Sequence, residues 1–574
     1  MTHSISTTAS THILGKDAAL EDSIQTMTQK LLKLGFTIIE QSWLNPIANV
    51  WSVHIRDKDC PLLFTNGKGA SKKAALASAL GEFFERLATH YFWADYYLGD
   101  SIANSKVVHY SNEKWFALDQ SNAWPEELLN EELNSFYNPD GMLAANQLID
   151  INASNSTNRG ICALPFVCER TQKTTYFPVN IIGNLYVSNG MSAGNTLFEA
   201  RVQALSEIFE RFIKFKIIAE GISLPDVPTE VLEQYPKIQE GIKELEKAGY
   251  GILVQDASLG GKYPVMVVTL LHPENQGVYA SFGAHPKFEV ALERALTELL
   301  QGRGLDALNG FAEAGFDQDE IASPQNLETH FIDSSGIIGW AFLQNKPDYD
   351  FDHWQAESNQ TPQTTEEEYR WLCDAIHQEG NDIYIADYQQ LGVYACRILV
   401  PGMSEIYPSD DLAWENNNAG VSFREMILAE NKSPMECEEL IEKLEALNLD
   451  DQLPVAEFIG LATDKDSIFS DLRIAELITL LALKAQDSER VQEGVEWLLH
   501  FQQINPQRLK TYQCIHALLQ LEGMSQYGHA LQKLYGEQTI SDALSLIDGK
   551  DVFSLSSHWE MHQRLVDAYG KLPR

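Results

Sequence analysis

Basic residues are scarce in this 574-residue chain. Its 42 lysines and arginines stand against 81 aspartates and glutamates, which gives a formal net charge of −39. Proteins that hold nucleic acid by neutralising its phosphates concentrate lysine and arginine, so the composition argues against direct nucleic-acid binding. The same deficit disfavours docking on an anionic membrane surface. We therefore expect neither nucleic acid nor a membrane among the partners.

Long apolar runs and paired cysteine motifs are also missing. No stretch approaches the roughly 18 apolar residues of a transmembrane helix. The polar N-terminal tail, residues 1–16, has no apolar segment of signal-peptide length. The seven cysteines include no CxxC pair, which disfavours a zinc knuckle or a thioredoxin-type motif. We expect reduced, mostly buried thiols in a cytoplasmic protein.

The composition is otherwise that of a globular protein, with 44% hydrophobic residues, and the length allows several domains. From residue 17 to residue 408, β-rich runs alternate with helical patterns, which predicts a mixed α/β (α+β) domain. The expected strands are 50–55, 62–65, 181–188, 265–271, 278–282, 383–386 and 393–400. The expected helices include 72–92, 197–218 and 290–302.

The last part of the chain has a different pattern. Residues 409–452 form a charged stretch that we interpret as a linker region, and a helical C-terminal domain is expected over 453–574. Apolar residues at i, i+3, i+4 and i+7 predict consecutive helices over 474–485, 489–501, 506–521 and 527–535. Helical hairpins of tetratricopeptide-like type fit this pattern, either as a packing element or as a partner-binding surface.

A three-fold internal repeat is the most informative feature. Residues 65–86, 188–211 and 281–302 each pass from a β-rich run through a glycine-containing turn into a helix. Each helix contains an Ala-Leu-X-Glu string, whose glutamates are Glu82, Glu207 and Glu298. Each glutamate has a polar residue four positions before it and another three positions after it. These flanking residues are Ser78, Gln203 and Arg294 before, and Glu85, Glu210 and Gln301 after.

Offsets of four and seven residues place these side chains on one helical face. On the second helix Glu199, eight residues before Glu207, extends the stripe, so that Glu199, Gln203, Glu207 and Glu210 line up over about three turns. Stacked carboxylates repel each other, so converging stripes would need cations between them. Mg²⁺ prefers oxygen ligands and is commonly shared with substrate phosphates, and Arg86, Arg211 and Arg294 could contact phosphate oxygens. The alternatives are three solvated helix faces, or a purely structural divalent-cation site.

Common nucleotide-binding loops are absent. The string Gly67-Lys68-Gly69 is not a GxxxxGK[ST] loop, and no GxGxxG occurs. Lys68 is explained equally well as a surface lysine, the run 366–368 is expected to be a solvated helix start, and His90 and His285 are expected to be structural. A bound nucleotide would therefore need an unusual arrangement of glutamate-bridged metals.

These motifs resemble the YcaO family, in its stand-alone branch, over the full chain. The resemblance is carried by the segment 15–24, by the string Ser188-Asn189-Gly190-Met191-Ser192-Ala193-Gly194-Asn195, by the paired Glu-X-Phe-Glu-Arg strings, and by Leu299-Leu300-Gln301-Gly302-Arg303 and the ILVPGM string at 398–403. It implies an ATP-binding fold peculiar to the family, with Mg²⁺ ions between glutamates and phosphates. It also implies activation of a peptide amide by phosphorylation of its carbonyl oxygen.

Carried over by motif, the resemblance implies two residue sets. The nucleotide set is Lys16, Ser23, Arg86, Ser192, Asn195, Gln203, Arg211 and Arg294. The Mg²⁺ set is Glu82, Glu85, Glu199, Glu207, Glu210 and Glu298. No general base or other catalytic side chain is assigned.

The chain departs from azoline-forming relatives in its last residues, which lack a proline-rich PxPxP string, and this puts the azoline-forming reaction in doubt. The resemblance to the stand-alone branch implies a homodimer and a link to β-methylthiolation of a small-subunit ribosomal protein. Two hypotheses stay open. The first is an ATP-dependent amide-activating enzyme with a peptide or protein substrate, and the second is an ATP-binding accessory protein for a methylthiotransferase or ribosomal partner.

Overall fold

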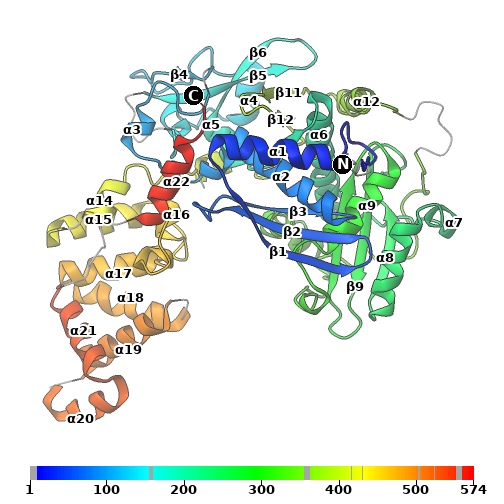
Figure 1. Cartoon of the computed structure of the whole chain (residues 1–574). Coiled ribbons are helices and arrows are strands. Elements are labelled where there is room, and N and C mark those ends of the chain that lie inside the picture. The colour runs from blue at the N-terminus through cyan, green and yellow to red at the C-terminus, as the bar shows by residue number, and fades with distance from the viewer. Residues whose placement is uncertain are drawn as a thin grey trace, which may run out of the picture.

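The structure is a computed structural model that describes residues 10–110, 112–153, 159–354, 362–414, 416–429, 431–501, 504–521, 524–550 and 559–573. Within these ranges the chain has a mixed α/β region followed by an all-α region (Figure 1), as the sequence predicts. Of the predicted N-terminal tail, residues 1–9 lie outside the described ranges.

Three sheets organise the α/β region. The first joins β1 (Ile38–Ile47), β2 (Val50–Asp57) and β3 (Phe64–Gly69), and the second joins β8 (Gly251–Asp256), β9 (Val265–Leu271) and β10 (Val278–Ala284). The third has the order β4-β5-β11-β12-β7, with β6 paired to β5. Its strands are β4 (Lys114–Phe116), β5 (Ile161–Cys168), β6 (Thr174–Pro178), β7 (Met191–Gly194), β11 (Tyr384–Tyr388) and β12 (Tyr394–Leu399).

The predicted repeat is present as three strand–helix units, one on each sheet. They are β3 with α2 (Lys72–Ala88), β7 with α6 (Leu197–Glu220), and β10 with α9 (Phe288–Leu299). In each unit a strand glycine lies against the following helix. A Cβ on Gly67 would overlap the carbonyl oxygen of Ala75, one on Gly194 would meet the Ala200 nitrogen, and one on Gly283 would overlap Ala291. These glycines therefore permit the close approach of strand and helix.

The other helices of this region cover the sheets and connect their strands. They are α1 (Leu20–Leu34), α3 (Asp100–Ala103), α4 (Glu131–Tyr137), α5 (Val179–Ile181), α7 (Thr229–Leu232), α8 (Pro236–Lys247), α10 (Gln318–Ile321), α11 (Pro324–Ile332) and α12 (Thr365–Gln378). The helix α1 packs on α2. Its N-terminal end therefore comes close to the carboxylate-bearing helix of the first repeat.

One predicted strand is wrong. Residues 181–188 form the end of α5 and a π-helical turn over Ile182–Tyr186. Ile181, Ile182, Leu185 and Tyr186 are all buried, so a largely apolar run that resembles a buried strand is here a short buried helix. Periodicity alone cannot distinguish the two in so short a run.

Residues 409–452, which we expected to be a linker, contain α13 (Asp411–Trp414), α14 (Arg424–Leu428) and α15 (Pro434–Ala446). The helix α15 packs on α17, and Cys437, Leu440 and Ile441 of α15 share one apolar core with α17–α19. The domain boundary stays a prediction. The helices that follow are α16 (Val455–Phe458), α17 (Ile474–Ala485), α18 (Ser488–Phe501), α19 (Pro506–Gln520), α20 (Met524–Tyr535), α21 (Glu537–Ile547) and α22 (Glu560–Gly570).

The last helix leaves this stack. In Figure 1, α22 (red) turns back to the α/β region while α17–α21 extend away from it. Leu565, Ala568 and Tyr569 of α22 are buried in the same core as α1 and α2. The indole Nε1 of Trp93 donates to the carbonyl oxygen of Leu565 at 3.0 Å. The C-terminal helix is thus part of the N-terminal core.

Among the described residues, no helix has the length and apolar character needed to cross a bilayer. The seven cysteines are free thiols, and all are buried, as expected.

Candidate functional site

A cavity of about 640 Å³ lies where the three repeat helices meet the N-terminal end of α1. All fourteen residues of the two predicted sets line it. Helix α2 contributes Glu82, Glu85 and Arg86; α6 contributes Glu199, Gln203, Glu207, Glu210 and Arg211; α9 contributes Arg294 and Glu298. The remaining four, Lys16, Ser23, Ser192 and Asn195, come from the segment before α1, from α1, from β7 and from the turn after it. The structure brings these positions together, and their ligand roles remain a proposal.

The first two repeats present the same glutamate–arginine pair. The Arg86 guanidinium donates from Nε and Nη2 to Oε1 of Glu82 at 3.0 and 2.8 Å. The Arg211 guanidinium donates to Oε1 of Glu207 at the same two distances. Each pair joins residues four apart on one helix, so the internal repeat of the sequence is also a repeat of geometry.

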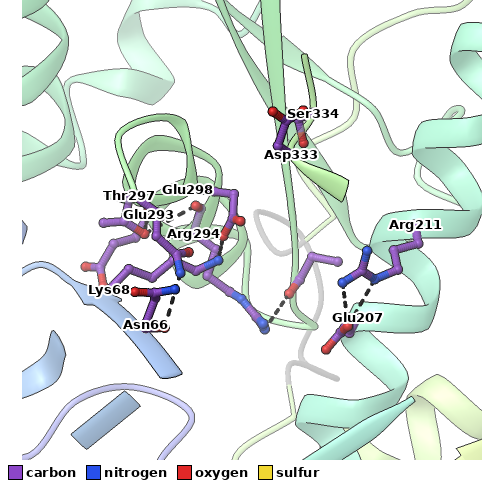
Figure 2. Close-up of polar contacts among 12 residues, drawn as sticks. Asn66, Lys68, Glu207, Arg211, Glu293, Arg294, Thr297, Glu298, Asp333 and Ser334 are labelled. Carbon is purple, nitrogen blue, oxygen red and sulfur yellow. Dashed lines mark hydrogen bonds and ion pairs between the residues drawn. The ribbon is translucent and has the colours of Figure 1, made fainter. Parts of the chain in front are cut away.

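The third repeat differs. Figure 2 shows Arg294, Lys68 and Glu298 on one side and the Glu207–Arg211 pair on the other. Lys68 of β3 forms an ion pair with Glu298 of α9, and Arg294 donates from Nη1 to the carbonyl oxygen of Ala284 at 2.9 Å. Burial, followed by the charge of Arg294, lowers the pKa of Lys68 to about 8. From the sequence alone, Lys68 could equally be a phosphate ligand or a surface lysine, because its partner Glu298 is 230 residues away in the chain.

A segment before α1 closes one end of the cavity. The carboxylate of Glu199 is 3% exposed and accepts hydrogen bonds from the Asn195 amide and from the backbone N–H of Asp17. Lys16 Nζ lies 3.4 Å from Glu199 Oε1, and Ser23 Oγ donates to Asn195 Oδ1 at 2.9 Å. Side chains far apart in sequence therefore fix each other around Glu199.

One residue at this end corrects an expectation from the sequence, and a second is a histidine expected to be structural. Glu368, expected in a solvated helix start, is fully buried. It forms an ion pair with Lys287, whose Nζ lies 2.8 Å from Glu368 Oε1. His285 lines the cavity and is 4% exposed. Its Nδ1 accepts the backbone N–H of Lys287 at 3.0 Å. Burial and three nearby cations lower the pKa of His285 well below its usual value, so the ring is neutral and its proton is on Nε2. Neither residue's burial could be read from the local pattern.

The carboxylates do not form a protein-only metal cage. Within the described part of the chain, no three His, Cys, Asp or Glu side chains lie close enough together to hold a metal ion. Mg²⁺ seldom needs such a cage, because it binds through one or two carboxylates, waters and substrate phosphates. Burial, together with the neighbouring Glu207 and Glu82, raises the pKa of Glu85 well above its usual value. A buried carboxyl repelled by two others fits a site that gains a cation together with a polyphosphate.

Comparison with known proteins decides the family. Residues 66–404 match the family model described as the YcaO cyclodehydratase that binds ATP and Mg²⁺. The chain belongs to the YcaO family. Residues 420–574 match the model described as the YcaO cyclodehydratase C-terminal domain. ATP and Mg²⁺ are accordingly the cofactors of this YcaO domain, and the cavity described above is the site whose residue chemistry fits them.

Two curated relatives match over nearly their whole length. One is the ribosomal protein S12 methylthiotransferase accessory factor YcaO of Escherichia coli K12, 51% identical over 98% of each chain. The other is an uncharacterized protein of Haemophilus influenzae, 48% identical over 99% of each chain. Among solved structures, YcaO from Methanopyrus kandleri bound with AMPPCP and Mg²⁺ matches with a TM-score of 0.40 and 17% identity, over 68% of this chain and 92% of that one.

Proposed function

We propose that this YcaO protein is a Mg²⁺-dependent ATP-using enzyme that activates a peptide amide by phosphorylating its carbonyl oxygen. The observation that carries the proposal is the convergence of all fourteen predicted residues on one cavity. Phosphoryl transfer depends on positioning and charge neutralisation more than on a side-chain nucleophile. A cavity lined by alternating carboxylates and guanidinium groups supplies both.

The paired side chains suggest how the site receives its ligands. Glu82 with Arg86, and Glu207 with Arg211, each place a carboxylate beside a guanidinium on one helical turn. A bound Mg²⁺–ATP complex offers cations to the carboxylates and phosphate oxygens to the arginines. Each pair can therefore exchange its internal ion pair for two ligand contacts, without leaving a charge unpaired.

The proposed reaction balances as follows. A thiol, hydroxyl or sulfide nucleophile adds to the amide carbon and loses its proton to solvent, which converts the carbonyl oxygen into an oxyanion. That oxyanion attacks the γ-phosphorus of ATP, the bond to the β-phosphate oxygen breaks, and ADP leaves. The phosphorylated adduct then expels phosphate together with the former carbonyl oxygen. A proton leaves to solvent from the amide nitrogen when a side-chain nucleophile has added, or from the added sulfur when sulfide has added, and the C=N or C=S bond forms. Arg86, Arg211, Arg294 and Lys68 are placed to stabilise the transferring charge.

A second candidate function is an ATP-binding accessory role without turnover. The observation that favours it is the name of the 51% identical relative, an accessory factor for S12 methylthiotransferase. In this case the nucleotide would order the α/β region, and the helical region would recruit the methylthiotransferase or its ribosomal protein substrate. We propose that either candidate function serves the β-methylthiolation of a ribosomal protein.

The cellular compartment and the oligomeric state are also proposals. We propose a cytoplasmic location, because the seven free, buried thiols suit a reducing compartment. We also propose a homodimer, which the family resemblance implies. Light scattering coupled to size exclusion will give the mass of the particle. A monomeric mass would exclude the dimer without affecting the proposed chemistry.

The first test is Mg²⁺-dependent binding. Calorimetric titration with ATP should show binding only with Mg²⁺ present, and the double variant Glu82→Ala/Glu207→Ala should abolish it. Glu220→Ala is the matched control, since Glu220 lies on the same helix α6 with its side chain 54% exposed and paired with Lys216. Equal affinity without Mg²⁺ would refute the carboxylate–metal argument.

The second test separates enzyme from accessory protein. Phosphate release from ATP is measured with purified protein, Mg²⁺, and S12 as the candidate substrate, with and without the methylthiotransferase. If the protein is an enzyme, S12 should stimulate phosphate release. Glu207→Ala should abolish this release, and Glu220→Ala should retain it. Tight nucleotide binding without any S12-dependent release, with or without the methylthiotransferase, would favour the accessory role.

A further inference from the structure

A second cavity, of about 310 Å³, lies beside the nucleotide cavity. Its walls come from α4, from α6, from the turn before β7, and from the segment 402–409 that follows β12. Three phenylalanines and a tyrosine line it: Phe136, Phe212, Phe215 and Tyr407. The polar and charged members of the lining are Asn189, Arg211, Glu405 and Ser409. A concave pocket with aromatic walls and a few polar groups at fixed positions is suited to an apolar side chain of a ligand that also carries polar groups.

Two of these aromatic rings are incompletely buried. Phe136 is 38% exposed, and Phe215 is half-buried. Neither belongs to any of the apolar cores of the described chain. By contrast, Phe209 of the same helix α6 is fully buried in the core. Leaving aromatic surface uncovered inside a pocket costs free energy, which suggests that a ligand covers it.

The pocket also has an unmet hydrogen-bond acceptor. Asn189 lines the pocket and is only 1% exposed. Its Nδ2 donates to the carbonyl oxygen of Ser404 at 2.8 Å, whereas its Oδ1 has no hydrogen-bond partner among the described residues. An unpaired buried acceptor costs about 1–3 kcal/mol. A donor on the ligand, such as a peptide N–H, would remove that cost.

The position of the pocket connects it to the phosphate-binding end of the proposed site. Arg211 lines both cavities. In the segment 188–192, which runs from the turn into β7, Ser188 and Ser192 line the nucleotide cavity, while Asn189 lines the second cavity. The proposed function assigns Arg211 to the phosphates of ATP, so a peptide whose reacting amide lies at the γ-phosphate would place a neighbouring residue at this pocket.

We propose that this pocket binds the peptide substrate next to the activated amide. It receives an aromatic or large apolar side chain between Phe136 and Phe215, and Asn189 accepts a backbone N–H of the same peptide. This inference rests on the proposed amide-activating function, and it assigns to that function a preference for a bulky apolar residue beside the reacting amide.

The test uses the full chain with Mg²⁺ and AMPPNP, and two blocked amino acids, N-acetyl-phenylalanine methylamide and N-acetyl-alanine methylamide. Saturation-transfer NMR titrations give both affinities. The phenylalanine compound should bind about tenfold more tightly than the alanine compound, because its ring is buried. Phe215→Ser should remove most of this preference. Asn189→Ala should weaken both compounds similarly, since both carry the same amides.

The matched control is Phe316→Ser, which changes an 88% exposed phenylalanine that stacks on Trp340 away from both cavities; it should alter neither affinity. Equal binding of the two compounds to wild type, no detectable binding of either, or an unchanged preference in Phe215→Ser would overturn the proposal. A parallel titration with ATP distinguishes the two failures. Loss of Mg²⁺-dependent nucleotide binding in wild type would refute the proposed function, whereas intact binding without a preference refutes only the peptide pocket.

Discussion

At the scale of single residues, Arg397 is a buried cation that the sequence analysis did not single out. Its side chain is 6% exposed, and its guanidinium donates to the carbonyl oxygen of Val187. Val187 has φ 50° and ψ −115°, a conformation that is strained for a β-branched residue. Arg397 therefore holds the start of the loop that carries Ser188 and Ser192 into the nucleotide cavity.

We expect Arg397→Met to weaken ATP binding by about tenfold, because a charge-assisted hydrogen bond of about 1.5–3 kcal/mol no longer holds the loop. Calorimetric titration with Mg²⁺–ATP measures this effect. Arg201→Met is the control, since it removes a guanidinium that pairs with Asp387 outside both cavities. The loop-positioning role is contradicted if the two variants bind ATP equally well, or if Arg397→Lys fails to restore part of the affinity.

Lys214 gives a prediction of pH dependence. It is 6% exposed and donates to the carbonyl oxygen of His330 and to Ser334 Oγ. Burial, followed by the charge of Arg211, lowers its pKa from 10.5 to about 7. Above pH 7 the folded protein loses this proton while the unfolded chain keeps it, so the free energy of unfolding rises with pH.

Between pH 7 and pH 9 this one group should add about 2 kcal/mol to the free energy of unfolding. Urea unfolding of wild type and Lys214→Met at both pH values measures the contribution, and the difference between the two proteins removes the effect of other titrating groups. A pH response identical in the two proteins would show that Lys214 keeps its ordinary pKa.

At the scale of elements, the site depends on the close packing of each repeat helix on its strand. In the first repeat, Gly67 of β3 leaves no room for a Cβ against the backbone of Ala75 and Ala79. Gly67→Ala must therefore push α2 from β3 and displace Glu82 and Glu85. We expect a loss of at least about 2 kcal/mol in stability together with weaker ATP binding, measured by urea unfolding and calorimetry.

A glycine on helix α2 itself, Gly81, provides the contrast to Gly67. A Cβ at Gly81 would meet nothing closer than 4.0 Å, the carbonyl oxygen of Ala193. Gly81→Ala should stabilise the protein by about 0.5–1 kcal/mol, because alanine is the better helix former. If both substitutions destabilised the protein equally, the close approach of strand and helix would not be the reason for Gly67.

The repeat also explains what could be predicted from the sequence. Glu82, Glu207 and Glu298 recur at one position of three similar units, so their convergence could be inferred without coordinates. Lys68 and Glu368 could not be placed in this way. Lys68 pairs with Glu298 of another unit, and Glu368 lies outside the repeat and pairs with Lys287 of the third unit. The composition of the run 181–188, rich in Ile, Tyr and Val, predicts a strand, and so short a run has no periodicity that could have indicated the helical turn instead.

At the scale of the whole molecule, the net charge of −39 does not oppose a polyphosphate ligand. The acidic residues of the cavity are interleaved with Lys16, Lys68, Arg86, Arg211 and Arg294, and Mg²⁺ adds further positive charge when it binds. From this acidic excess we expect no basic patch for nucleic acid, and the local field of the cavity is set by its own residues.

The two regions of the chain are joined through α22, which predicts that they do not unfold independently. Leu565 of α22 is fully buried in the core that also contains α1 and α2. Leu565→Ala should lower the free energy of unfolding by about 2–5 kcal/mol. Since α1 carries Ser23 into the nucleotide cavity, the variant should also weaken ATP binding. Leu534→Ala on α20, where the side chain is 67% exposed, is the matched control and should change neither quantity.

Calorimetric unfolding distinguishes this coupling from a C-terminal helix that is merely appended. If α22 were merely appended, Leu565→Ala would lower the melting temperature of the α17–α21 stack alone, and the α/β region would keep its wild-type melting temperature.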